Sequence, residues 1–187
     1  MCRDRLAETG ALLLVARSGH GKSSLVRAGL VPSLRAEGRS VVVVRLGEEP
    51  LASLEGALLG QPDETILVVD QAEELFTLVD DESVRETVAA VLLRQLALGG
   101  LVVVLRADHV GSLALLPDLA RALERSSYVL GAMTEDGLRD AIDEPARRQG
   151  CRVEPGLVEV LVQEARGHPG ALPLLSHALH ELSLIHI

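Results

Sequence analysis

At 187 residues, with 48% hydrophobic and 24% charged residues, the chain is long enough for one full domain and a smaller companion with a packed core. The net charge of −9 argues against general binding of nucleic acid, and no apolar run reaches the roughly 18 residues of a membrane span, so we expect neither kind of partner. The two cysteines form no zinc-ligand spacing and no disulfide framework, and the first residues carry no secretion signal, so we expect a cytoplasmic protein.

Short apolar runs rich in valine and leucine predict five strands, at Leu12–Ala16, Val41–Val44, Ile66–Val69, Leu101–Leu105 and Ser127–Leu130. The first four runs do not alternate polar and apolar residues, which indicates strands buried on both faces, as in a parallel sheet covered by helices. The intervening segments predict three helices, at Ser23–Arg35, Pro50–Leu59 and Glu82–Leu98. This alternation is typical of βαβ units with right-handed crossovers and predicts the α/β class.

The pattern changes after Gly131. Thr134 is followed by Glu135 and Asp136, which is the composition of a helix cap with acids in the first turn. From there to Leu182 the sequence is helical in pattern, interrupted by glycine and proline. We therefore predict an α/β domain at residues 1–132 and an all-helical subdomain at residues 133–187.

The segment Ala16–Ser23 follows a predicted buried strand and opens a predicted helix, which is the context of a phosphate-binding P-loop. Small residues let backbone N–H groups turn inward, and the start of the helix adds unpaired N–H groups and a positive dipole end. Lys22, the only lysine, would reach the β- and γ-phosphates, and the Ser23 hydroxyl would ligate Mg²⁺. His20 would act through its backbone. Nucleotide contacts are expected from Ser18, Gly19, His20, Gly21, Lys22, Ser23 and Ser24.

Asp70 follows the buried run Ile66–Val69, at the position where a Walker B aspartate holds Mg²⁺, usually through water. A helix cap is the alternative role for this carboxylate. Many P-loop ATPases place a glutamate directly after the aspartate, but here that residue is Gln71. Glu73 and Glu74 are therefore the candidates for orienting or activating the attacking water, and solvated side chains at a helix start are the alternative.

Arg106 follows the next strand and is predicted to sense the γ-phosphate, with an ion pair to Asp108 as the alternative. We expect the ammonium of Lys22, the hydroxyl of Ser23 and the carboxylate of Asp70 to converge where two neighbouring strands end. These groups would enclose a triphosphate and its Mg²⁺ ion.

Several segments carry a family resemblance when they are taken together. Ser18–Leu30 resembles the P-loop of the STAND NTPases, specifically the bacterial novel STAND group, and Val68–Thr77 resembles the Walker B segment of that group. Leu105–Asp108 resembles its sensor segment. Pro155–Val158 and Gly167–Leu175 are similar to its helical lid, including a Gly-x-Pro motif.

The resemblance runs from about residue 12 to about residue 182 and implies five parallel strands in AAA-like order, followed by a helical lid. It implies an ATP- or GTP-binding, Mg²⁺-dependent switch that gates self-association and signalling in a larger multidomain protein. Pro169 would then pack near the adenine, and Glu73 and Glu74 would support hydrolysis. The family would continue beyond the end of the chain, so we interpret the sequence as a fragment, with Met1–Arg5 and Ser183–Ile187 outside the native domain.

Three functions remain open at this point. The leading hypothesis is an ATPase switch that cleaves the β–γ phosphoanhydride. A nucleotide-gated oligomerisation scaffold without significant hydrolysis is the second, because Gln71 occupies the usual place of the catalytic glutamate. A small-molecule kinase is the third and least favoured, because such enzymes usually carry an arginine-rich mobile lid, whereas the region after the predicted sheet is acidic to neutral.

Overall fold

A computed structural model describes residues 2–148, 150 and 152–166 and contains a five-stranded parallel sheet in the order β2-β3-β4-β1-β5. The strands are β1 (Ala11–Ala16), β2 (Val41–Val44), β3 (Ile66–Val69), β4 (Leu101–Arg106) and β5 (Ser127–Val129). Each lies within one residue of its predicted bounds. The predicted α/β class, the parallel sheet and its AAA-like order are therefore confirmed.

The helices of this part of the chain are α1 (Cys2–Thr9), α2 (Lys22–Ser24), the π-helical turn η1 (Leu25–Leu30), α3 (Val31–Ala36), α4 (Pro50–Leu58), α5 (Glu74–Thr77), α6 (Glu82–Leu98), the 3₁₀ segments η2 (Ala107–Leu115) and η3 (Glu124–Ser126), and α7 (Pro117–Leu123). The predicted helices correspond to the continuous stretch α2-η1-α3, to α4 and to α6. The remaining helical segments were not predicted from the sequence; most of them are short, and the eight-residue α1 buries only Leu6.

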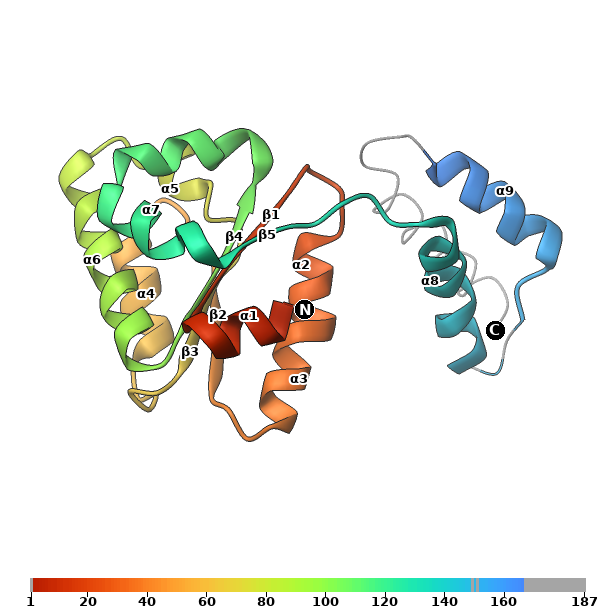
Figure 1. The fold of residues 1–187 in the computed structure, drawn as a ribbon, viewed down its shortest axis with the longest axis horizontal. Helices are drawn as coiled ribbons and strands as arrows, with labels where there is room; N and C mark the ends of the chain where they lie inside the picture. Colours follow the sequence, from red (N-terminus) through yellow and green to blue (C-terminus); the bar gives the residue numbers. More distant parts are fainter. Residues whose placement is uncertain (1, 149, 151, 167–187) are drawn as a thin grey trace. The chain divides into compact units, whose positions relative to one another are not determined.

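Alternate residues of the strands face two separate hydrophobic layers, which lie on opposite sides of the sheet (Figure 1). In β1, Leu13 and Val15 face the layer made with α4, α5, α6 and α7, whereas Leu12 and Leu14 face the layer made with α1, η1 and α3. Burial on both faces is therefore confirmed for the central strands. The edge strand β2 departs from this prediction, because its two middle valines are only partly buried.

The first residues belong to this fold. Leu6 of α1 is buried in the second layer, and the guanidinium of Arg5 donates a hydrogen bond of 2.6 Å to the carbonyl of Ser127 in β5. The expectation that Met1–Arg5 lie outside the domain is therefore wrong for the residues that the structure describes, because α1 packs on the second layer and bonds to β5.

The strand order corrects one expectation about the site. The strands that carry the P-loop and the acidic end, β1 and β3, are not neighbours, because β4 lies between them. The register still brings the three carboxyl ends together, since Ala16 of β1 pairs with Arg106 of β4, and Val69 of β3 pairs with Val103 of β4. The end of β4 therefore lies between the two expected halves of the site.

The chain divides into two compact units. The first contains residues 1–16 and 22–130, and the second contains residues 17–21 and the residues from Gly131 onward. In the second unit, α8 (Glu135–Arg148) packs on α9 (Pro155–Ala165) through Leu138, Ile142, Val158 and Val162. The predicted cap of α8 is confirmed, since the Thr134 hydroxyl accepts a hydrogen bond of 3.2 Å from the Gly137 amide. Among the described residues, no helix combines the length and apolar character needed to cross a membrane.

Candidate functional site

The loop between β1 and α2 turns at two glycines. Gly19 and Gly21 have φ angles of 77° and 80°, in the left-handed region that glycine adopts without steric cost. A glycine on either side of His20 therefore lets the chain reverse sharply before the helical stretch begins at Lys22. The His20 Nδ1 atom is buried and makes no hydrogen bond.

Lys22 is the first residue of α2, and its side chain reaches back to the carboxyl end of β1. Its ammonium donates a hydrogen bond of 2.9 Å to the carbonyl of Ala16. Burial lowers the pKa of this ammonium, and the neighbouring carboxylate of Glu73 opposes the shift. Of the acidic side chains that influence this pKa, Glu73 therefore has the largest effect.

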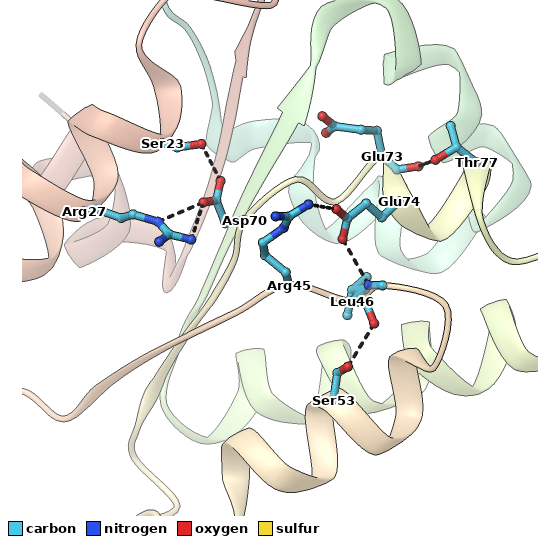
Figure 2. A network of polar contacts seen from close by, with 10 residues as sticks. Ser23, Arg27, Arg45, Leu46, Ser53, Asp70, Glu73, Glu74 and Thr77 are labelled. Carbon is cyan, nitrogen blue, oxygen red and sulfur yellow. Dashed lines mark hydrogen bonds and ion pairs between the residues drawn. The ribbon is translucent and has the colours of Figure 1, made fainter. Parts of the chain in front are cut away.

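Ser23 and Asp70 meet although they are 47 positions apart in the sequence (Figure 2). The Ser23 hydroxyl donates a hydrogen bond of 2.8 Å to Asp70 Oδ1, and only 1% of the Asp70 side chain is exposed. The guanidinium of Arg27 donates to the other carboxylate oxygen, with its Nε and Nη2 atoms each 3.1 Å from Asp70 Oδ2. The sequence predicts the first contact but not the second.

The donor set formed by Ser23 and Asp70 fits a magnesium ion. A hydroxyl and a carboxylate are hard oxygen ligands, and Mg²⁺ in nucleotide sites is usually bound by one or two protein oxygens together with water and phosphates. Within the described residues, no cluster of three or more histidine, cysteine, aspartate or glutamate side chains is placed to hold a metal. The residues present therefore suit a metal that arrives with a phosphate ligand rather than a site built wholly from protein.

The turn after β3 sends its two glutamates in different directions. Gln71 has a φ of 58°, the one positive φ of a non-glycine residue in the described part of the chain. The next residues are fixed by hydrogen bonds from the Ala72 amide to Val104 (2.9 Å) and from the Glu74 amide to Gln71 (3.0 Å). Such a left-handed residue costs of the order of 1 kcal/mol. It persists here beside the buried carboxylate of the candidate site.

Glu73 lies at the edge where the strands end. Its Oε2 atom accepts a hydrogen bond of 3.3 Å from the backbone amide of Arg106 at the end of β4. Glu74 instead is buried, forms an ion pair with Arg45, and accepts a hydrogen bond of 3.0 Å from the Gly47 amide (Figure 2). The geometry thus brings Glu73 toward Lys22 and ties Glu74 to the segment that follows β2.

The guanidinium of Arg106 pairs with Asp108, as in the alternative raised by the sequence. The Nη2–Oδ2 distance is 2.6 Å and the Nε–Oδ1 distance is 3.1 Å. These hydrogen bonds raise the pKa of Arg106 and lower that of Asp108. Among the other predicted contacts, Ser18 and Ser24 are exposed, and Pro169 lies outside the described residues.

Two arginines near the site, Arg27 and Arg45, escaped the sequence analysis. A signal for Arg27 was available, because it stands four positions after Ser23 on the same helical stretch, and side chains with that spacing share a face. No comparable signal existed for Arg45, since its ion pair with Glu74 joins residues 29 positions apart.

A glycine-turned loop after β1, a lysine at the end of that strand, and a serine–aspartate pair at the same edge of an all-parallel sheet together define a class of protein. The chain is an α/β P-loop NTPase domain with AAA-like strand order. It matches the family described as Novel STAND NTPase 1 over residues 1–184, and it belongs to that family. The match includes the first five residues, which agrees with the packing of α1.

Solved structures confirm the fold. Domain III of the replication initiation protein DnaA from Thermotoga maritima aligns with a TM-score of 0.68 at 14% identity, over 98% of this chain and 80% of that chain. The Aeropyrum pernix ORC1 protein in complex with DNA aligns at 0.65 and 18% identity, over 93% of this chain and 56% of that one. AMPPCP-bound DnaA from Aquifex aeolicus aligns at 0.65 and 12% identity, over 98% and 59%. No curated protein sequence matches significantly.

Proposed function

We propose that this chain binds ATP, or GTP, with Mg²⁺ and hydrolyses it slowly, as the nucleotide-driven switch module of a larger signalling protein. The observation that carries the proposal is the contact of the Ser23 hydroxyl with the buried Asp70 carboxylate, beside Lys22 at the carboxyl edge of the sheet. Membership of an NTPase family and the likeness to an AMPPCP-bound DnaA support it.

Each side chain has a distinct role in this proposal. The amides of Ser18, Gly19, His20, Gly21 and Ser24 bind phosphate oxygens, and the Lys22 ammonium neutralises the β- and γ-phosphates. Ser23 and Asp70 hold the metal, Asp70 through water. When bound, Mg²⁺ supplies positive charge to the β- and γ-phosphate oxygens during cleavage.

Glu73 is the group we assign to the attacking water. Its side chain lies at the same edge of the sheet as the Lys22 ammonium. Glu74, in contrast, is held in an ion pair with Arg45. A carboxylate in this position orients water and accepts its proton, a role that typically contributes about 100-fold or more to the rate. Arg106 is the sensor, and it must then exchange its partner Asp108 for the γ-phosphate.

The larger assembly is also part of the proposal. Residues 1–132 form the nucleotide-binding domain and residues 133–187 a helical lid, with Pro169 near the base. The lid and the nucleotide state together control self-association in the cytoplasm, and effector and sensor domains lie elsewhere in the full protein. The solved neighbours include DNA-bound proteins, but we propose no nucleic-acid partner here because the net charge is −9.

Binding of a fluorescent ATP analogue by the intact protein, with and without Mg²⁺, tests the core of the proposal. We expect Lys22→Ala to abolish binding of the analogue, and Asp70→Asn to remove only the Mg²⁺ dependence of that binding. The control Arg121→Gln, which alters an exposed ion pair with Asp118, should change neither the binding nor its Mg²⁺ dependence. Wild-type protein that binds no nucleotide would end the proposal.

The scaffold function keeps one observation in its favour, since Gln71 rather than a carboxylate follows Asp70. Phosphate release under saturating Mg-ATP decides between the two functions. A switch ATPase releases phosphate slowly and loses that activity in Glu73→Gln, whereas a scaffold binds Mg-ATP and releases none. Transfer of phosphate to a small acceptor would instead revive the kinase alternative.

A further inference from the structure

Asp70 already has a positively charged partner within the protein. The Arg27 Nε atom donates a hydrogen bond to Asp70 Oδ2, the Nη2 atom lies 3.1 Å from the same oxygen as an ion pair, and the Ser23 hydroxyl donates to Oδ1. Without this guanidinium, the buried carboxylate would keep only one hydrogen bond from these two side chains.

The two partners of the pair differ sharply in exposure. The Asp70 side chain is 1% exposed, whereas that of Arg27 is 57% exposed. A long, half-exposed arginine can move into water at low cost, because it exchanges one charged hydrogen bond for hydration. The buried Asp70 carboxylate cannot exchange its partner for water in the same way. A cation, or a water molecule bound to it, that takes a place at Asp70 Oδ2 must therefore displace the arginine.

The helical stretch explains how Arg27 reaches this position. Arg27 stands four positions after Ser23, so the two side chains share one face of the helical stretch and both reach Asp70 at the end of β3. Arg27 lies in the π-helical turn Leu25–Leu30, where the amide of Val31 bonds to the carbonyl of Val26. Wide π-turns of this kind are uncommon and are often found at functional sites.

We propose that Arg27 is an internal counter-ion of Asp70 that the Mg²⁺ of the bound nucleotide displaces. The arginine holds the carboxylate in its orientation in the nucleotide-free protein, and it lowers the apparent affinity for Mg²⁺ because the ion pair must open first. Arg27 is thus a positioning residue that acts through Asp70. This inference rests on the proposed function, since it requires Mg-nucleotide binding at the same carboxylate.

The first test measures how the affinity for a fluorescent ATP analogue depends on Mg²⁺ concentration in the wild type, in Arg27→Gln and in the control Arg121→Gln. We expect Arg27→Gln to lower the Mg²⁺ midpoint by roughly threefold to tenfold, the equivalent of losing one charge-assisted hydrogen bond. The affinity of Arg27→Gln for the analogue in EDTA should stay within about twofold of the wild type. If Arg27 had only a structural role, this Mg²⁺-free affinity would change as well. Arg121→Gln should match the wild type.

A second measurement keeps the proposal falsifiable if Arg27→Gln is unstable. Thermal unfolding without ligand, in a cycle of Arg27→Gln, Asp70→Asn and the double variant, should show that the effect of Arg27→Gln disappears once Asp70 is neutral. Additive effects of the two substitutions on the melting temperature would overturn this inference but not the proposed function. So would a Mg²⁺ midpoint for Arg27→Gln that is equal to or above that of the wild type. A wild type that shows no Mg²⁺-dependent nucleotide binding would overturn the proposed function and this inference with it.

Discussion

At the scale of single residues, the turn after β3 places two adjacent glutamates, Glu73 and Glu74, in different surroundings. Glu73 and Glu74 follow the left-handed residue Gln71, which rotates the chain between the end of β3 and the start of α5. Glu73 is left at the edge of the sheet with Lys22, and Glu74 is buried against Arg45. Their chemistry in solution would be nearly identical, so the backbone decides which one is available for the proposed catalytic role.

This division predicts different failures for the two glutamine variants. Glu73→Gln should reduce phosphate release by about 100-fold or more while leaving the melting temperature within about a degree of the wild type. Glu74→Gln should lower the free energy of unfolding by about 1–3 kcal/mol, because a buried charged hydrogen bond is lost. Calorimetry and a phosphate-release assay on the same preparations check both. Equal loss of activity in two equally stable variants would contradict the assignment.

At the scale of elements, the end of α6 is fitted closely against the start of β3. The buried side-chain amide of Gln95 donates hydrogen bonds to the carbonyls of Thr65 (2.6 Å) and Asp63 (3.3 Å). A Cβ atom placed on Gly99 would lie 2.3 Å from the Thr65 carbonyl oxygen. Glycine is therefore required by this close approach, and the contact helps to fix β3, the strand that directly precedes Asp70.

We predict that Gly99→Ala lowers the free energy of unfolding by about 3 kcal/mol, at the upper end of the range for overpacking, because backbone atoms must move apart. Gly56→Ala is the matched control. Gly56 lies inside α4, and apart from its chain neighbours and the backbone of its own helix no atom lies within 4 Å of the position that an added methyl group would take, so alanine there should stabilise the helix by up to about 1 kcal/mol. Urea unfolding of both variants gives the two values. Destabilisation by both would show that the predicted clash is not the cause.

The start of α6 provides a test based on pH. Asp81 caps the helix by accepting hydrogen bonds from the amide (2.8 Å) and hydroxyl (2.7 Å) of Ser83, which lower its pKa. Since the pKa is lower in the folded state, this stabilisation is fully present above the ordinary value of about 3.9 and is lost as the pH falls through the folded value. Asp81→Ala should therefore melt at a lower temperature than the wild type at pH 7. The difference should shrink below about pH 4.

At the scale of the whole molecule, the parts that the sequence predicts well are those encoded by local patterns. Runs such as Val41–Val44 define strands within a residue, and the P-loop motif together with a strand-end aspartate predicts the contact between Ser23 and Asp70. Contacts between distant segments escape such patterns. The place of β4 between β1 and β3 is predicted only through the AAA-like order that the family resemblance implies, and the pair of Arg45 with Glu74 is not predicted at all, because both depend on the path of the chain through space.

The same scale carries the last prediction, because a ligand that binds only the folded state stabilises the whole nucleotide-binding unit by mass action. At a concentration of Mg-ATP about 100 times its dissociation constant, the gain is about 2.7 kcal/mol. For a unit of this size, that gain should raise the melting temperature by on the order of 10 °C. Lys22→Ala should remove the shift without lowering the melting temperature of the free protein, since burial of the ammonium already lowers its pKa and costs solvation. An equal shift in wild type and Lys22→Ala would mean that the nucleotide binds elsewhere.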